Sequence, residues 1–146
     1  DTMIKTFRGM MADGAQNRIS LHTNDGSMGY RIVKFQIIPN APGTVTHESV
    51  VKIYKIEQAA VDGTIDFSDQ TLLAAAYQTD QDNPQYAGYL GPIVFDQEIF
   101  NQDIFVTNND ADSATVMNYY IELEQVKLNL DENTVATLKN IRNTTQ

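Results

Sequence analysis

The chain has 146 residues, of which 42% are hydrophobic, so its length fits one globular domain with a substantial core. Its formal net charge of −9 argues against binding a nucleic acid backbone or an anionic membrane surface, because both attract basic faces. Cysteine is absent, which excludes disulfides, thiolate nucleophiles and cysteine-based zinc sites. No apolar run reaches the roughly 18 residues of a membrane span, and the start, DTMIKTFRG, has no signal-peptide core.

The first part of the chain predicts strands, because its apolar residues recur with a period of two. A strand in IKTFRGMM is followed by a turn at Asp13-Gly14. The run NRISLHT places Ile19 and Leu21 on one face, and MGYRIVKFQIIP is rich in aromatic and β-branched residues. Asp25-Gly26 lies between these two runs and accepts the positive φ angles of a tight turn, which predicts an antiparallel hairpin.

The next strand is predicted from His47 to Glu57, after a type II turn at Pro42-Gly43. It is apolar on both faces, so it lies either between two layers of the fold or at a contact between subunits. One face carries Val51 and Ile53. The other face carries three interface candidates, which are Val50, Tyr54 and Ile56.

The segment TLLAAAYQ is compatible with helix or strand, and we interpret it as a strand that ends at a long polar loop. This loop, from Thr79 to Gly91, contains Tyr86 and Tyr89. Tyrosine provides a large contact area at low entropic cost, so both residues are candidates for an interface or for stacking on a sugar. The alternative is that they hold the loop against its own sandwich.

The stretch VFDQEIFNQDIFVTNNDAD, from Val94 to Asp112, repeats phenylalanine at a step of five, in Phe95, Phe100 and Phe105. A step of five fits neither one face of a strand nor one face of a helix. We therefore predict two short strands joined by a bend or a bulge near Asp96–Asn101.

The end of this stretch is a candidate calcium site, because Asn109, Asp110 and Asp112 could supply the oxygen ligands that calcium prefers. The acidic spacing of an EF-hand loop is absent. The favoured interpretation is a turn stabilised by Asn and Asp side chains. No other metal and no cofactor is predicted.

The last strand is predicted in TVMNYYIELEQVKLN, where a change of phase suggests a bulge near Glu124–Gln125 or a change of partner sheet. A capping-box spacing from Asn129 to Glu132 then precedes apolar residues at helical intervals, which predicts a short helix over 130–143. Together, the elements predict an all-β fold, an antiparallel β-sandwich of the jelly-roll kind, with strands to about residue 128 and one C-terminal helix. We expect residues 1–146 to form a single domain.

No catalytic motif is present, so we expect no enzyme activity. The chain lacks the G-x-S-x-G elbow and the phosphate-binding glycine motifs. His22 and His47 are the only histidines, fewer than a zinc enzyme usually needs once its cysteines are also absent. A glycan hydrolase needs two carboxylates across a cleft, and the sequence singles out no such pair among its 19 acids.

Four segments carry a resemblance: KTFRGMMADGAQNRISLHTNDGSMGYRIVKFQI, ESVVKIYKIEQ, IFNQDIFVTNND and MNYYIELEQVKLN. Together they resemble small virion-associated proteins encoded by marine bacteriophages. The resemblance spans most of the chain, is one of general style, and implies a β-sandwich capsid, capsid-decoration or tail component without catalytic residues.

The resemblance and the absence of a catalytic motif lead to one main hypothesis. The chain is a structural protein of the virion, located there, that contacts other virion proteins and forms a homo-oligomer, a trimer or a pentamer. The alternative is a carbohydrate- or receptor-binding module of a phage tail or spike that uses Tyr86 and Tyr89.

Overall fold

The computed structural model describes residues 3–21, 27–43, 46–80, 88–95 and 97–128, and the side chains of 88–90 are not part of this description. This part of the chain contains eight strands and no helix, and therefore no helix that could cross a membrane. The predicted helix over 130–143 lies outside the described residues. The strands are β1 (Met3–Met11), β2 (Gln16–Ile19), β3 (Met28–Pro39), β4 (His47–Tyr54), β5 (Leu72–Asp80), β6 (Gly88–Val94), β7 (Ile104–Asp110) and β8 (Met117–Lys127).

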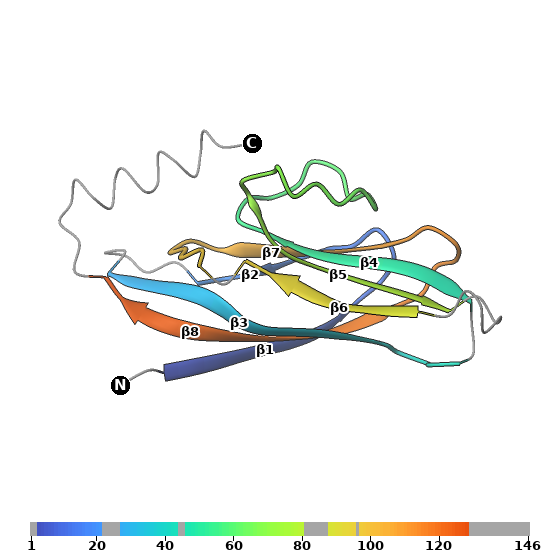
Figure 1. Ribbon diagram of the computed structural model, residues 1–146, viewed down its shortest axis with the longest axis horizontal. Helices are drawn as coiled ribbons and strands as arrows, with labels where there is room; N and C mark the ends of the chain where they lie inside the picture. The colour runs from blue at the N-terminus through green and yellow to red at the C-terminus, as the bar shows by residue number, and fades with distance from the viewer. Residues whose placement is uncertain (1–2, 22–26, 44–45, 81–87, 96, 129–146) are drawn as a thin grey trace.

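The strands form two antiparallel sheets that face one another (Figure 1). Sheet A has the order β1-β8-β3, and sheet B has the order β2-β7-β4-β5-β6. All strand pairs within both sheets are antiparallel. The all-β, antiparallel, two-layered architecture predicted from the sequence is therefore confirmed.

The core lies between the sheets, and each sheet contributes alternate residues to it because side chains in a strand point to opposite faces. The strand β8 shows this most clearly: Met117, Ile121 and Leu123 are fully buried. From sheet B, Val51 of β4 and Val106 of β7 are equally inaccessible. These residues belong to one continuous hydrophobic cluster, so the described strands share a single core.

The hairpin predicted at Asp25-Gly26 is wrong. Its two flanking strands do not pair with each other, because β2 pairs with β7 in sheet B and β3 pairs with β8 in sheet A. The predicted turn at Asp13-Gly14 is present, with Gly14 at a φ of 81°, but it too carries the chain from one sheet to the other. An Asp-Gly pair specifies the local backbone conformation, whereas the choice of partner strand depends on contacts far away in the sequence.

The bulge predicted near Glu124–Gln125 lies instead in the partner strand. The register of β8 against β1 is regular from Met3↔Gln125 to Met11↔Met117. The register of β8 against β3 shifts between Ile32 and Lys34, which leaves Val33 as the extra residue. The change in apolar alternation along β8 did not reveal that its partner strand, β3, carries the irregularity.

The strand structure of the stretch 94–112 is interrupted as predicted, but by a connection over residues 95–103 and not by a short bend between two strands of the stretch. The strands β6 and β7 are joined by residues 95–103, which cross from one side of β4 and β5 to the other. On the way, Phe100 exchanges two backbone hydrogen bonds with Tyr30 of β3, of 2.8 and 2.9 Å. Phe100 is buried and stacks on the Tyr30 ring, while Phe95 contacts Phe67 outside the core.

The segment TLLAAAYQ forms a strand, as predicted, within β5. The loop predicted from Thr79 to Gly91 is shorter, because β6 begins at Gly88 and pairs with β5. Tyr89 therefore lies in a strand, opposite Gln78, rather than in a loop.

Candidate functional site

The strand β4 is apolar on both faces, and its second apolar face is covered by residues of the same chain. Val50 and Tyr54 are each only 7% exposed, although they point away from the core between the sheets. Residues 55–71, the β4–β5 loop, arch over this outer side of sheet B (Figure 1). Of the predicted interface residues, Val50 and Tyr54 are therefore covered without a second subunit, and Ile56 is half-buried.

The remaining two interface candidates give no site geometry. Tyr86 lies outside the described residues, and for Tyr89 only the backbone is described.

Lys52 is the attachment point of the β4–β5 loop. Its side chain is 2% exposed, and its Nζ lies 3.1 Å from Asp62 Oδ1 and donates to the carbonyl oxygen of Thr64. The ammonium also lies 5.3 Å from the centre of the Tyr54 ring. The hydrogen bond from Lys52 is the main cause that lowers the pKa of Asp62. A buried cation thus holds an exposed carboxylate and, with it, the loop.

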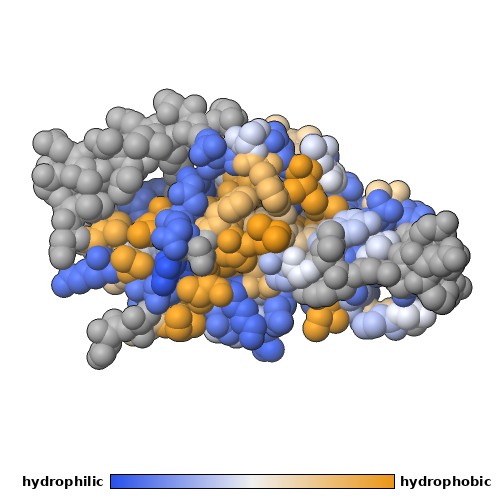
Figure 2. All heavy atoms as spheres, in the orientation of Figure 1, coloured by the Kyte–Doolittle hydropathy of each residue, from blue (hydrophilic) through white to orange (hydrophobic). Residues whose placement is uncertain are grey.

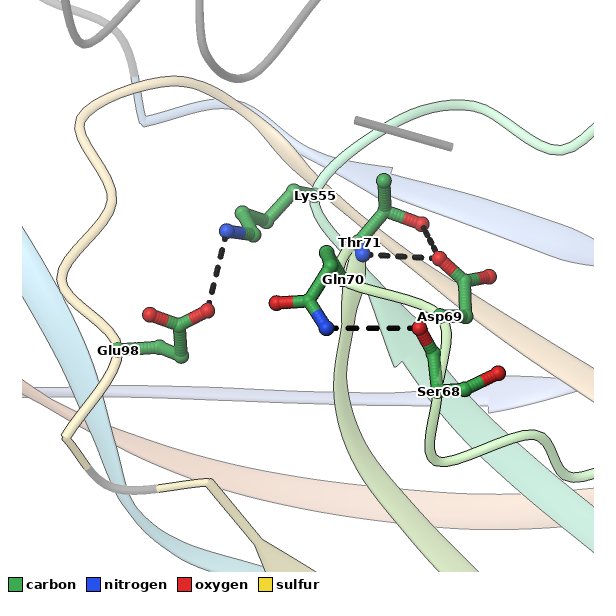
Figure 3. A network of polar contacts seen from close by, with 6 residues as sticks. All are labelled: Lys55, Ser68, Asp69, Gln70, Thr71 and Glu98. Carbon is green, nitrogen blue, oxygen red and sulfur yellow. Dashed lines mark hydrogen bonds and ion pairs between the residues drawn. The ribbon is translucent and has the colours of Figure 1, made fainter. Parts of the chain in front are cut away.

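A second set of polar contacts joins this loop to the segment between β6 and β7. Figure 3 shows Lys55, just after β4, pointing toward Glu98, and the Nζ–Oε1 distance is 3.2 Å. In the same view, Asp69 accepts hydrogen bonds from the backbone and hydroxyl of Thr71. Such contacts shape loops, and the Thr71 hydroxyl is buried, so a substrate cannot reach it.

The acids of the 94–112 stretch do not gather in one place. Asp103 pairs with Arg18 of β2 at 2.6 Å, while Glu98 pairs with Lys55. Asp96 lies outside the described residues. Asp103 and Glu98 are thus each paired with a cation from another element, so these two carboxylates join parts of the fold.

Asp110 has a structural role that is visible in its partners. Its Oδ1 accepts hydrogen bonds from the backbone N–H groups of Glu48, Asp112 and Ser113, and its Oδ2 accepts one from Thr115. Burial raises the pKa of Asp110, but these four hydrogen bonds together lower it well below the usual range. The carboxylate therefore shapes the β7–β8 turn and ties it to β4.

The predicted calcium ligands are not brought together. Asn109 and Asp110 are consecutive residues of a strand, so their side chains point to opposite faces of sheet B. Asn109 lies next to Gly63 of the β4–β5 loop, and the exposed Asp112 is in the turn. Across the described residues, no group of three or more His, Cys, Asp or Glu could hold a metal ion.

Of the two histidines, only His47 is described. Its Nδ1 lies 3.1 Å from the Ser49 hydroxyl, and both side chains are buried, with Ser49 fully inaccessible. A hydroxyl that a substrate cannot reach is unsuited to nucleophilic attack. We therefore interpret this pair as part of the polar end of the core.

One hollow lined by described residues was not predicted from the sequence. It has a volume of about 540 Å³ and lies on the outer face of sheet A. Its lining comes from all three strands: Arg8, Gly9, Met10, Gln36, Ile38, Asn118, Tyr119 and Tyr120.

This hollow combines polar and apolar groups. Met10 and Ile38 are each 59% exposed at opposite edges of sheet A, with Asn118 of β8 between them and Gln36 two residues before Ile38 on β3. The hydroxyl of Tyr120 donates to Glu122 at 2.6 Å, which raises the pKa of the tyrosine and restrains its ring. In the sequence, only the alternation of side chains along each of β1, β3 and β8 could have indicated that these residues share a face.

A scan against protein-family models and a search of curated proteins found no match to this chain.

Proposed function

We propose that the chain is a structural subunit of a bacteriophage virion with a jelly-roll fold. In a jelly roll, a long antiparallel ribbon pairs the first strand with the last and the second with the second-last, and then rolls into two sheets. The pairs β1–β8, β2–β7 and β4–β5 follow this rule. This strand order is the observation that carries the proposal.

One strand departs from the rule. The jelly-roll order would pair β6 with β3, whereas β6 pairs with β5 at the edge of sheet B. The chain nevertheless returns to β3 directly after β6, through the Tyr30–Phe100 bridge. We interpret the arrangement as a jelly roll whose sixth strand has moved from one sheet to the other.

Viral capsid proteins and lectins both use this architecture, so the fold alone does not choose between them. The resemblance to small virion-associated proteins favours the virion. The site geometry adds support, because Glu98, Asp103 and Asp110 serve as links within the fold. The proposed subunit works by contact with copies of itself and with other virion proteins.

Mass spectrometry of purified particles tests this proposal. The expected result is that peptides of this chain co-purify with the particle at a constant ratio to its other proteins. Their absence from purified particles would contradict the proposal.

The hollow on sheet A favours a second candidate, a carbohydrate-binding module. Its volume of about 540 Å³ lies in the range of ligand sites, roughly 300–1,000 Å³. Amide groups such as those of Gln36 and Asn118 bind sugar hydroxyls, and the Tyr120 ring offers a stacking surface. This site differs from the Tyr86 and Tyr89 loop predicted from the sequence.

A glycan array tests this candidate. We expect the wild-type chain to bind at least one glycan and the Tyr120→Ala variant to lose that binding. Binding that survives the substitution would reject the hollow as the site.

A further inference from the structure

The strand β1 offers a long unpaired edge. It has nine residues and is hydrogen-bonded only to β8, and no other described strand pairs with it. Ile4 and Met10, on the outer face of sheet A, are 47% and 59% exposed. Separate groups of apolar atoms, with hydrophilic atoms between them, reach the lower margin of Figure 2, where Figure 1 shows the strands of sheet A. A long apolar edge strand is a template for pairing with another strand.

We propose that the partner is a second copy of this chain, whose β1 pairs antiparallel with the first across a two-fold axis at Phe7. The contact is isologous, since each copy presents the same strand to the other. It joins the two three-stranded sheets into one continuous sheet, and the main-chain hydrogen bonds of the paired edges provide the affinity. This inference goes beyond the proposed function and does not depend on it.

The sequence of β1, MIKTFRGMM, is self-complementary in this register. On the outer face, Ile4 of each copy lies opposite Met10 of the other, so two exposed apolar pairs form. On the inner face, Phe7 meets Phe7, an aromatic cross-strand pair of the kind that stabilises sheets. Lys5 lies opposite Gly9, and Arg8 lies opposite Thr6, so no like charges are directly opposed.

Registers shifted by two residues are worse. One shift places Arg8 opposite Arg8, and the other places Ile4 opposite Arg8; each also leaves two residues of each strand unpaired. Like charges directly opposite in a sheet are destabilising. The register centred on Phe7 is therefore the only one of the three that uses the whole strand and matches its exposed apolar residues.

Two features limit the strength of this contact. A strand edge is small beside the 1,200–2,000 Å² of a standard interface, so the pairing depends on protein concentration. In addition, the two Arg8 side chains lie diagonally across the pair, about 7–8 Å apart, and each copy carries a net charge of −9. Both repulsions are screened by salt, so a higher salt concentration strengthens the pairing.

Sedimentation equilibrium on the full chain tests the proposal with a charge swap across the two-fold axis. We expect Ile4→Lys to halve the mass of the wild-type assembly, and Met10→Glu to do the same. The double variant Ile4→Lys with Met10→Glu places Lys opposite Glu of the other copy and restores the mass. Within one chain the two positions are six residues apart, about 20 Å, so they cannot rescue each other directly.

The matched control is Ile38→Glu. Ile38 has the same 59% exposure as Met10 and lies on the outer face of the same sheet, but on its other edge strand, β3. We expect this variant to keep the wild-type mass. Folding is checked by thermal melting, and a lysine at position 4 suits the strand because it lies opposite Glu124 of its own chain.

Three results would overturn the proposal: a wild-type monomer up to millimolar concentration, a mass unaffected by either single substitution, or a double variant that is not restored. A mass halved by Ile38→Glu would place the contact on the face of sheet A and would also overturn it. The mass is expected to halve if the wild-type assembly is a simple dimer, and equally if it consists of two trimers or two pentamers joined through β1. Mass spectrometry of particles tests the virion proposal separately, so the two can fail independently.

Discussion

At the scale of single residues, Gly9 shows how an absent side chain shapes a surface. Its position in β1 is directly opposite Tyr119 in β8. The Tyr119 ring occupies the space where a Cβ would lie, and its hydroxyl accepts a hydrogen bond from Asn17 of β2. One glycine thus allows a tyrosine of sheet A to reach sheet B at the edge of the core.

We expect Gly9→Ala to lower the free energy of unfolding by about 1–3 kcal/mol, because the new methyl group displaces a buried ring. Urea unfolding measures this change. The control is Gly91→Ala in β6, where a Cβ meets nothing within 4 Å, and which we expect to be neutral or slightly stabilising. Equal effects of the two substitutions would show that the Tyr119 contact is unimportant.

At the scale of elements, the sequence predicted the strands better than their partners. The alternation of Met117, Tyr119, Ile121 and Leu123 is a local property, and it identified both the strand and its buried face. The pairing of β2 with β7 joins residues nearly 90 positions apart, which no local pattern encodes. The Asp25-Gly26 signal was therefore read as a hairpin, although the chain changes sheet there.

The candidate site was predictable to a smaller degree. The predicted turn after Asp110 is present, since its carboxylate accepts hydrogen bonds from the backbone of the residues that follow, a property of nearby residues. The cover over Val50 and Tyr54 was not predictable, because residues 55–71 carry no regular pattern. The hollow on sheet A requires three strands in register, so it emerges only from the assembled sheet.

In the ion pair that links β4 to its covering loop, Lys52 is buried and Asp62 is exposed. We therefore expect substitutions of the two residues to have unequal effects on stability. Asp62→Ala leaves the Lys52 ammonium buried without its carboxylate, so we expect a loss of about 1–3 kcal/mol in unfolding free energy. Lys52→Met keeps the buried apolar stem and leaves Asp62, whose side chain is 65% exposed, to water. We expect this change to stay within about 1 kcal/mol.

Urea unfolding measures both variants, and amide hydrogen exchange over residues 57–70 reports the loop directly. A larger loss for Lys52→Met than for Asp62→Ala would contradict the description of Lys52 as the buried partner.

At the scale of the whole molecule, Asp110 connects parts of the chain that are distant in sequence. It receives hydrogen bonds from β4 and from the β7–β8 turn, and its own backbone N–H donates to Asp13 in the β1–β2 turn at 2.7 Å. Loops that connect the two sheets are thus held together at one end of the sandwich. The stability of that end depends on a charged carboxylate.

Because hydrogen bonds lower the pKa of Asp110 in the folded state, its contribution is complete above the unfolded pKa, near 3.8. The contribution decreases as the pH falls below that value toward the lowered pKa of the folded chain. We expect Asp110→Asn to reduce the unfolding free energy at pH 7 by about 2 kcal/mol. The difference from wild type should shrink as the pH is lowered from 5 to 3.

Urea midpoints at a series of pH values measure this difference. The control is Asp112→Asn in the same turn, where the side chain is exposed and a small effect is expected. A constant difference between wild type and Asp110→Asn from pH 7 to pH 3 would contradict the assignment.

The bridge between Tyr30 and Phe100 has a consequence for how far an assembly can grow. Sheet A has two outer strands, and on β3 the backbone of Phe100 already occupies the edge at Tyr30, close to the irregularity at Val33. Within the described chain, only β1 offers this sheet an uninterrupted edge. If two copies join there, sheet A of each copy has no further uninterrupted edge, and the joined sheet terminates at six strands instead of propagating as a fibre. An acidic protein with an apolar edge strand could in this way associate in pairs and still avoid open-ended polymerisation through this sheet.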